Sequence, residues 1–421
     1  MTERTTFLGT DKVDMVAGNG LMSRRHLLTR GAAVTGALSS ATLMTLGSPV
    51  AAGSDVLTVP EWMKVPGEAV DPYGLPSRFE KLARNPRTPL QYLDGMITPN
   101  PLHFVIAHNG VPDIDPDQHR FLIHGLVKRP LEFTLEALER YPRISRIVFL
   151  ECAGNGRALY EEQPVKGDAQ SIQGLLSCAE WTGVSLAMLL DEAGVDQRAK
   201  WLLAEGADAA AMSRSIPLAK ALDDAFIALY QNGEPIRPSN GFPMRLMVPG
   251  FHGNMNVKWL RRIELTAGPM MTKDETSHYS MLLKDGSVAQ FKFPIDAKSV
   301  ITHPSPGLTL RGPGFYEISG AAWSGNGKIV KVEVSADGGR SWAPAALSEP
   351  VLSKAITRFR SPWQWDGGPA VLQSRATDDT GYVQPAREQL LEKRGRNAFY
   401  FNNAITSWGV ASSGQVTHVY V

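Results

Sequence analysis

The sequence predicts an α+β protein in which a domain of mixed helices and strands is followed by a β-sandwich. From His103 to Thr266, apolar segments typical of strands alternate with segments whose apolar residues recur at three- and four-residue spacing, as in helices. From Gly307 onward, short runs of alternating polarity are separated by glycine-rich turns, which is typical of sandwiches. At 421 residues the chain is long enough for two domains with separate cores.

Residues 1–52 are predicted to be an export signal. Arg24 and Arg25 precede a weakly apolar stretch, residues 31–50, that is too polar for a stable membrane span. Paired arginines before such a stretch are typical of twin-arginine signals, whose route exports folded proteins. We therefore expect a periplasmic protein, cleaved near Ala51-Ala52, with no membrane span in the mature chain. The alternative is a basic helix cap in a cytoplasmic protein.

Three further segments follow. Residues 53–101 carry scattered Pro, Gly and charge, and we expect an extended N-terminal arm there. Residues 102–290 form the predicted mixed domain, with strands at HFVIAH and FLIHGLV and helices at LEALERY and VSLAMLLDEAG. Residues 267–302, which span the boundary between this domain and the next, are interpreted as a connector. Residues 291–421 form the predicted all-β sandwich, with turns at 325–327 and 337–339.

Composition excludes some partners and cofactors. The 43 basic and 42 acidic residues nearly cancel, so nothing suggests a nucleic-acid partner. The chain has two cysteines, Cys152 and Cys178, and Cys178 is interpreted as a small buried hydrophobe. No Cys-x-x-Cys-His motif occurs, so we expect no c-type haem in this chain. Electrons released by a redox reaction would have to leave through a partner.

Cys152 is the principal candidate for chemistry. The preceding residues, Ile144 to Leu150, are typical of a buried strand, and the polar loop at residues 153–156 cannot continue it. The thiol is therefore expected at a strand end that faces a pocket. Arg157 follows, and it is expected to lower the pKa of the thiol or to contact an anionic ligand. For an isolated cysteine, the alternative is an inert buried side chain.

The loop C-A-G-N-G-R resembles the pattern C-A-G-N-x-R of the sulfite oxidase family, in which the cysteine thiolate binds molybdenum as a soft ligand. Five more segments resemble the family in the same order, namely LHFVIAHNGVPDIDPDQHRFLIHGLV, FTLEALERYP, WTGVSLAMLL, SIPLAKALDDAFIALYQNGEPI and GFPMRLMVPGFHGNMNVKWLRRIEL. The tail, with VKVEVSADGGRSW, ATDDTGYVQP and NNAITSW, resembles the family's immunoglobulin-like dimerisation domain. The resemblance implies a molybdopterin-binding domain followed by that sandwich.

The resemblance also implies roles for individual residues around a molybdenum–molybdopterin cofactor. Cys152 matches the metal ligand, and His108 matches the family's pterin-contacting histidine. Arg245 and Lys258 match the cations that hold the pterin phosphate, a role that suits paired charged donors. Tyr279 matches the tyrosine near the metal, where a hydroxyl can direct a proton.

Three departures from the family pattern bear on the substrate. Ile106 takes the place of an anion-binding arginine, and the lost contact is worth roughly 1.5–3 kcal/mol. Gly156 stands where many members have a first arginine, and Asn240 replaces a usual histidine. Arg157 remains as a catalytic candidate, with Arg360 as a weaker one from the sandwich. Fewer cations favour a less charged or tethered substrate.

This pattern resembles the molybdenum subunits of sulfane dehydrogenases, a branch of the family. It implies oxidation of sulfane sulfur bound to a carrier protein, with water as the oxygen source. Electrons would pass to a dihaem cytochrome c subunit, in a homodimer or heterotetramer. The nearest alternative is a periplasmic sulfite dehydrogenase acting on free sulfite. A molybdenum reductase of sulfoxides and a non-catalytic interaction subunit are the other two.

Overall fold

The structure of the chain is a computed structural model that describes residues 15–17, 21–22, 50–51, 59–66 and 86–421. The chain divides into two units, Met1–Ser48 and Pro49–Val421, and in the first unit β1 (Met15–Ala17) pairs antiparallel with β2 (Leu21–Met22). Arg24 and Arg25 lie outside the described residues, so the export signal stays a prediction. No helix within the described residues is long and apolar enough to cross a membrane.

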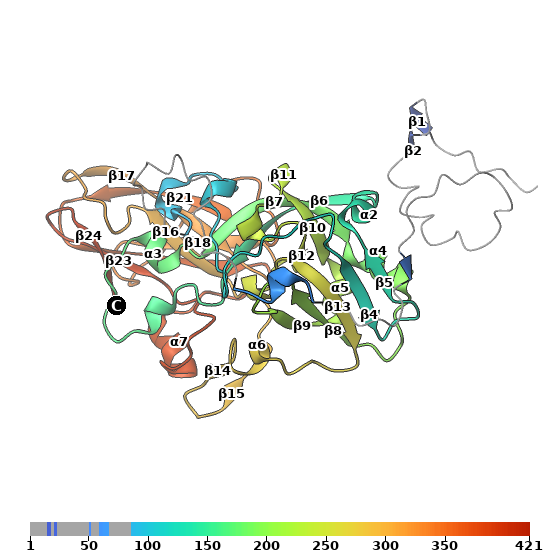
Figure 1. The fold of residues 1–421 in the computed structure, drawn as a ribbon. Helices are drawn as coiled ribbons and strands as arrows, with labels where there is room; N and C mark the ends of the chain where they lie inside the picture. Colours follow the sequence, from blue (N-terminus) through green and yellow to red (C-terminus); the bar gives the residue numbers. More distant parts are fainter. Residues whose placement is uncertain (1–14, 18–20, 23–49, 52–58, 67–85) are drawn as a thin grey trace, which may run out of the picture. The chain divides into compact units, whose positions relative to one another are not determined.

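The mixed domain is built on two sheets (Figure 1). The first sheet is antiparallel, with the order β11-β10-β7-β6 and a further strand on β10; its strands are β6 (Arg143–Glu151), β7 (Leu176–Ser185), β10 (Phe226–Gln231), β11 (Glu234–Pro235) and β12 (Arg245–Met247). The second sheet has the strand order β3-β5-β4-β13-β8-β9. Its strands are β3 (Val50–Ala51), β5 (Leu131–Phe133), β4 (Phe121–Gly125), β13 (Leu260–Thr266), β8 (Trp201–Gly206) and β9 (Ser213–Pro217). Only β4 and β13 pair in parallel within it.

Short helices complete this domain, and the predicted amphipathic pattern is confirmed in the longest of them. α4 (Leu186–Ala193) buries Leu186, Leu189 and Leu190 at helical spacing, and these residues join one core with side chains of both sheets. The other helices are α2 (Leu135–Glu139), α3 (Ala169–Gln173), α5 (Leu218–Asp223) and α6 (Lys273–Thr276). Single 3-10 turns occur at Glu61–Met63, Leu90–Tyr92, Asn100–Leu102, Arg157–Tyr160, Pro238–Asn240 and Gly253–Met255.

The C-terminal region forms two antiparallel sheets, drawn in orange and red in Figure 1. The first contains β16 (Lys298–His303), β17 (Gly314–Trp323), β21 (Thr357–Trp365) and β20 (Ala346–Leu347) in that order. The second contains β19 (Ala343–Pro344), β18 (Ile329–Ser335), β22 (Ala370–Asp378), β23 (Ser407–Val410) and β24 (Val416–Val419). Side chains of both sheets, among them Trp323, Phe359 and Trp408, share one core.

Strand β6 separates two of these cores because its successive side chains point to opposite faces. Phe149 packs in the core of the sandwich, whereas Val148 and Leu150 pack with Trp181 in a smaller cluster. Cys152 follows Leu150 by two residues and joins the same cluster. The alternation therefore directs the thiol away from the sandwich core.

The structure corrects three details of the predicted elements. HFVIAH is not a strand, because its backbone hydrogen bonds leave the sheet: Phe104 N donates to Ser177 Oγ (2.9 Å) and Val105 N donates to Pro86 O (2.9 Å). The predicted connector carries α6 and a hairpin of β14 (Met281–Leu282) and β15 (Val288–Ala289), and β16 begins in it. The region predicted as all-β contains the helix α7 (Arg387–Arg394).

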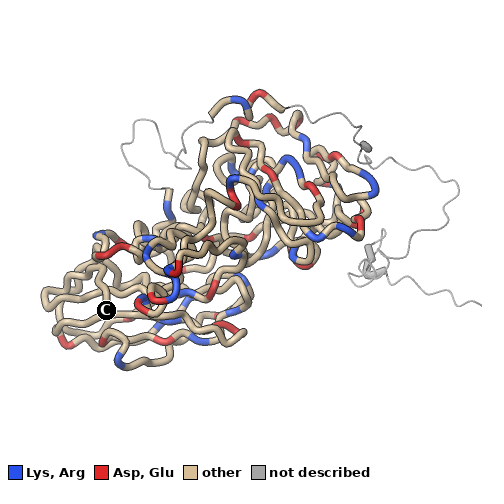
Figure 2. The backbone as a smooth tube through the Cα atoms, turned by 90° about the horizontal axis from the view of Figure 1, so that it is seen from below, with Lys and Arg blue, Asp and Glu red and all other residues tan. Residues whose placement is uncertain are grey.

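Charged residues of both signs are mixed along the chain. Figure 2 shows Lys and Arg interspersed with Asp and Glu over the described backbone. This agrees with the near balance of 43 basic and 42 acidic residues in the sequence. The charges that matter for the site are therefore the few buried ones, not a surface field.

Candidate functional site

Cys152 lies directly after β6, in a loop held by backbone and side-chain hydrogen bonds. Cys152 N donates to Leu175 O (3.0 Å), and Asn155 N donates back to Cys152 O (2.9 Å). The Asn155 amide bridges the loop, because its Nδ2 donates to Glu151 Oε1 (2.9 Å) while its Oδ1 accepts from Leu175 N (3.1 Å). This network fixes the position of the thiol.

The geometry of Gly156 explains why this position carries no side chain. Its φ of 75° is in the left-handed region that favours glycine. A Cβ there would lie 3.1 Å from Lys298 Nζ and 3.1 Å from the amide of Gln173. An arginine at this position, as in the family pattern, would therefore crowd the buried Lys298, which forms an ion pair with Glu151 (2.8 Å).

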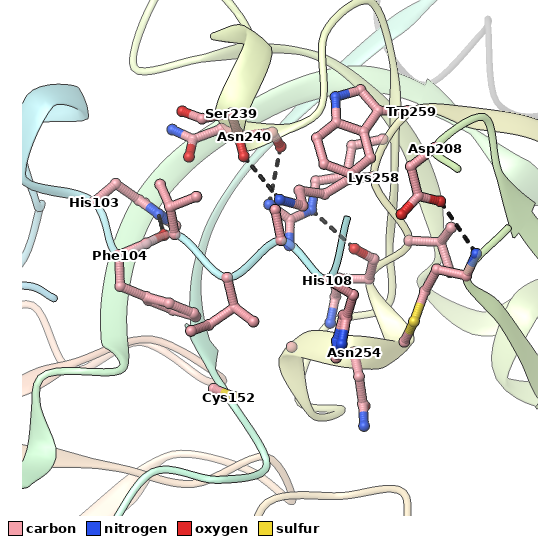
Figure 3. A pocket seen from close by; sticks show the side chains of 18 of the residues that line it. His103, Phe104, His108, Cys152, Asp208, Ser239, Asn240, Asn254, Lys258 and Trp259 are labelled. Carbon is pink, nitrogen blue, oxygen red and sulfur yellow. Dashed lines mark hydrogen bonds between the residues drawn. The ribbon is translucent and has the colours of Figure 1, made fainter. Parts of the chain in front are cut away.

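Cys152 lines a cavity together with all of the other residues predicted to bind the cofactor. His108, Arg245, Lys258 and Tyr279 all line it. In the view of Figure 3, Cys152 lies toward the bottom of the cavity, and Lys258 and Trp259 lie toward the top. The fold therefore brings together residues that are up to 171 positions apart in the sequence, as in the hydrogen bond between His108 and Tyr279.

Arg245 and Lys258 are cations without a carboxylate at ion-pair distance among the described residues. Arg245 donates only to backbone carbonyls, those of Asn256 (3.0 Å) and Asn240 (3.0 Å), and Lys258 Nζ donates to Ser239 O (2.9 Å). Burial lowers the pKa of Arg245 to about 9, and burial with the adjacent Arg245 lowers the pKa of Lys258 to about 7. Two neighbouring cations that repel each other in a buried wall favour the binding of an anion.

His103 also lines the cavity and was missed in the sequence. The residue is 5% exposed, and burial lowers its pKa to about 3, so the imidazole is neutral. Nδ1 lies 3.0 Å from Phe104 O and donates to it, which leaves Nε2 as an acceptor without a partner. A buried acceptor in a cavity wall is suited to a hydrogen-bond donor of a bound cofactor. A lone histidine beside phenylalanine gave no signal for this role.

Tyr279 and His108 form a neutral hydrogen-bonded pair in the cavity. Tyr279 Oη lies 3.0 Å from His108 Nε2. Burial raises the pKa of Tyr279 and lowers that of His108, so neither group is charged at neutral pH. The Tyr279 backbone has φ of 54°, and the guanidinium of Arg214 lies 4.8 Å from the centre of its ring. The phenol is thus held in place by its surroundings.

The two arginine candidates, Arg157 and Arg360, lie in different surroundings. Arg157 begins the turn after the Cys152 loop, and its charge acts on the thiol. As expected, the charge of Arg157 lowers the pKa of the Cys152 thiol, but burial has the larger and opposite effect, so the pKa is raised above its usual value. Arg360 lies in β21, where it pairs with Glu317 (2.9 Å) and is 51% exposed, and it does not line the cavity. Its catalytic role stays a prediction without support from this chain's geometry.

The other departures from the family pattern also lie at the cavity. Ile106 lines it and is 39% exposed, so an apolar side chain stands where the family places an arginine. Asn240 lines it too, and its carbonyl accepts from Arg245 while its amide donates to Gln231 Oε1 (3.0 Å). Arg87 was missed in the sequence: its charge acts on both Cys152 and Arg157.

The residues present fit a molybdopterin cofactor. Two unpaired cations can hold its phosphate, the free Nε2 of His103 can accept from its ring system, and one thiolate can bind the metal. No cluster of three or more His, Cys, Asp or Glu side chains that could hold a metal ion occurs in the described part of the chain.

Comparisons with known proteins agree with this geometry. Residues 108–273 match the model of the oxidoreductase molybdopterin binding domain, and residues 289–408 match that of the Mo-co oxidoreductase dimerisation domain. The chain is 33% identical to the mitochondrial sulfite oxidase of Rattus norvegicus over 77% of this chain and 65% of that protein. It is 33% identical to the sulfite oxidase of Gallus gallus over 66% of this chain and 67% of that protein. The chain thus spans about two thirds of the length of these relatives.

A solved structure is also similar. The crystal structure of the sulfane dehydrogenase SoxCD from Paracoccus pantotrophus matches with a TM-score of 0.78 and 44% identity, over 84% of this chain and 95% of that chain. The matches confirm the predicted fold, a molybdopterin domain of mixed α and β structure followed by the immunoglobulin-like dimerisation sandwich. With a relative of 33% identity covered over 67% of its length, the chain belongs to the sulfite oxidase family of molybdopterin oxidoreductases.

Proposed function

We propose that this chain is the molybdenum subunit of a periplasmic sulfane dehydrogenase. It oxidises sulfane sulfur bound to a carrier protein, takes the oxygen from water and passes electrons to a cytochrome c. The observation that carries this proposal is the 44% identity to a sulfane dehydrogenase over 95% of that chain, against 33% to the sulfite oxidases. The apolar Ile106 at the cavity supports it.

The chain's own residues have defined tasks in this proposal. Bound molybdenum supplies oxygen-atom transfer and two-electron redox chemistry, which no side chain provides. Cys152 contributes a soft thiolate to the metal. Arg245 and Lys258 hold the cofactor phosphate, and His103 and His108 orient the pterin from the cavity wall.

Tyr279 and His108 handle a proton in this scheme. Because the phenol and the imidazole are both neutral and 3.0 Å apart, the pair can accept a proton at His108 and release one at Tyr279 without leaving a buried charge. His108 and Tyr279 both line the cavity that Cys152 lines, which supports a proton transfer within the same cavity.

The proposed assembly has three parts. The electron acceptor is a dihaem cytochrome c subunit, the substrate is presented by a sulfur carrier protein, and the sandwich mediates a homodimer or heterotetramer. The match to the dimerisation-domain model and the similarity to the sulfane dehydrogenase SoxCD support these partners. Export by the twin-arginine route would place the assembled, metal-loaded chain in the periplasm.

Oxidation of free sulfite is the second candidate. The identity to sulfite oxidases of Rattus norvegicus and Gallus gallus favours it, and so do the positive charges of Arg87 and Arg157, which both act on the Cys152 thiol. Purified metal-loaded protein should be assayed with its cytochrome against sulfite and against a carrier loaded with a persulfide. We expect turnover with the loaded carrier. Efficient sulfite oxidation with no reaction on the carrier would replace the first proposal with the second.

Ile106→Arg tests the substrate preference within the cavity. A new charge-assisted contact should improve the apparent affinity for sulfite about tenfold and slow the reaction of the carrier-bound sulfur. Val330→Arg is a matched control, because Val330 is 49% exposed on β18 of the sandwich. An unchanged sulfite affinity in the Ile106 variant would remove the role given to this position.

Variants of the predicted export signal test the proposed periplasmic location. Arg24→Lys and Arg25→Lys together should leave folded protein in the cytoplasm, since the signal is recognised as a pair. Lys12→Arg in the same segment is a control that keeps both arginines. A normal periplasmic yield from the double variant would show that another signal directs the chain.

A further inference from the structure

A second, smaller cavity borders the Cys152 loop where the mixed domain meets the sandwich. Residues from three distant parts of the chain line it, among them Cys152, Ala153, His252, Phe401, Asn402 and Asn403. It gives the centre of a water molecule ≈ 10 Å³ of space, and one buried water needs about 10–15 Å³ by this measure. The cavity is therefore of the size of a single water molecule.

The Cys152 loop is held between the two segments that form the other walls of this cavity. On the sandwich side, Phe401 N donates to Ala153 O (2.7 Å). On the other side, Gly253 packs directly on the loop, because a Cβ at Gly253 would lie 3.0 Å from Glu151 O. The rings of His252 and Phe401 are in contact, with centres 4.3 Å apart. The loop that carries the thiol thus depends on both segments for its position.

Four buried polar atoms in the wall of this cavity have no hydrogen-bond partner among the described residues. They are both ring nitrogens of His252, Nδ2 of Asn402 and Oδ1 of Asn403, and these three residues are 3–4% exposed. Buried polar atoms are nearly always bonded to protein or to ordered water. Four such atoms around one small space therefore indicate a shared polar ligand.

The donors and acceptors in this wall are mixed. Asn402 Oδ1 accepts from Ala404 N (3.0 Å), which leaves its Nδ2 as a donor. Asn403 Nδ2 donates to Tyr382 Oη (3.0 Å), which leaves its Oδ1 as an acceptor. Burial lowers the pKa of His252 well below its usual value, so the neutral ring offers one donor and one acceptor. A neutral molecule that both donates and accepts fits this set better than an ion.

We propose that this cavity binds one ordered water molecule, which bridges His252 to the Asn402–Asn403 segment and so positions the Cys152 loop against the sandwich. A buried water typically makes about three hydrogen bonds, which the four free atoms can supply. His252 is then a positioning residue that acts through the loop. The site serves the loop whichever sulfur compound the chain oxidises, so it goes beyond the proposed function.

A crystal structure of the metal-loaded protein at about 1.5 Å resolution tests the site directly. We expect density for one water within hydrogen-bond distance, about 2.7–3.2 Å, of a His252 ring nitrogen and of Asn402 Nδ2 or Asn403 Oδ1. A cavity without such density, or a direct hydrogen bond between His252 and either asparagine, would overturn the proposal.

Two variants separate the water bridge from simple packing. His252→Phe keeps a ring but removes both nitrogens, whereas His252→Gln keeps a donor and an acceptor but not the ring. If the water positions the loop, hydrogen exchange of the Phe401 amide should become about 5- to 10-fold faster in His252→Phe and stay close to wild type in His252→Gln. Mass spectrometry of short peptides from the full chain measures both rates.

His124→Phe is the matched control. His124 also has a buried ring nitrogen without a partner among the described residues, but it lies on β4 and lines neither cavity, so exchange at Phe401 should not change. Faster exchange in His252→Gln than in His252→Phe would show that the ring acts by packing, and would overturn the water bridge. If His252→Phe does not fold, the wild-type crystal structure decides. None of these measurements uses turnover, so their outcome is independent of the proposed function.

Discussion

The buried basic side chains near Cys152 fall into two contrasting groups. Lys298 and Arg214 are each paired, Lys298 with Glu151 (2.8 Å) and Arg214 with Glu275 (2.8 Å). Arg245 and Lys258 meet only carbonyl oxygens and aromatic rings. The first group has its counter-charges within the fold. The second group lacks them, so its charges are completed only by a ligand.

The contrast separates residues that stabilise the fold from residues that bind. The carboxylate of Glu275, which pairs with Arg214, also accepts a hydrogen bond from Ser215 N (2.8 Å). Arg245 and Lys258 line the cavity, whereas the paired cations do not. Buried charge without a protein partner destabilises the empty fold, and a chain retains it where a ligand offsets that cost.

The largest effect is expected from breaking a paired cation. Arg214→Met leaves the carboxylate of Glu275 buried without its partner, and we expect a loss of about 3–5 kcal/mol in the free energy of unfolding. Urea denaturation measures it. The double variant Arg214→Met with Glu275→Gln should recover much of the loss. A loss below about 1 kcal/mol in the single variant would show that this pair is not structural.

Removing an unpaired cation should weaken cofactor binding and leave the stability of the cofactor-free protein unchanged. Lys258→Met should reduce cofactor retention by about 10- to 100-fold, the effect of one charge-assisted contact, while the cofactor-free protein unfolds no more easily than wild type. Molybdenum and pterin content after gel filtration and urea denaturation of the cofactor-free protein give both values. A destabilised cofactor-free variant with full cofactor content would reverse the assignment of Lys258.

The pH dependence of the cofactor-free protein should reveal Lys258. Its pKa is about 7 in the fold and near 10.4 in the unfolded chain, so between these values the unfolded chain binds the extra proton. Stability should therefore rise with pH from 7 toward 10, by up to about 1.4 kcal/mol per pH unit from this group. Lys258→Met should lose that part of the slope. Identical slopes in wild type and variant would contradict the lowered pKa.

The smallest effect concerns an exposed pair. Arg360 and Glu317 lie 2.9 Å apart with 51% and 48% of their side chains exposed. Such pairs contribute about 0.2–1 kcal/mol, so Arg360→Ala should change stability by less than about 1 kcal/mol and leave turnover by the purified protein unchanged. A tenfold fall in turnover would show that Arg360 reaches a site after all, in the assembled oligomer.

The sequence predicted the parts of the site that lie in recognisable local patterns. Cys152 was placed correctly at a strand end, since the apolar run before it and the glycines after it limit the strand on both sides. Resemblance to a family identified four further site residues, and all four line the cavity, namely His108, Arg245, Lys258 and Tyr279. Their roles stay predictions until a ligand is bound.

What the sequence could not predict depends on contacts between distant segments. Arg87 lies in a stretch without periodicity and His103 begins a segment predicted as a strand. Their placement follows from hydrogen bonds that join Arg87, Thr88 and Phe104 to residues 170–177. HFVIAH has the composition of a strand, yet it lies as an extended segment because its partners are a loop and a side chain. The lowering effect of Arg157 on the pKa of Cys152 could be read from the sequence, whereas the larger, opposing effect of burial could not.

The central claim is that Cys152 binds molybdenum in a cavity built for a cofactor phosphate. X-ray absorption at the molybdenum edge, on purified wild type and Cys152→Ser with equal molybdenum content, tests it most directly. The variant should show one sulfur neighbour fewer and no turnover with any sulfur substrate, since a hydroxyl replaces the soft thiolate poorly. An unchanged number of sulfur neighbours, together with undiminished turnover, would contradict the assignment of Cys152.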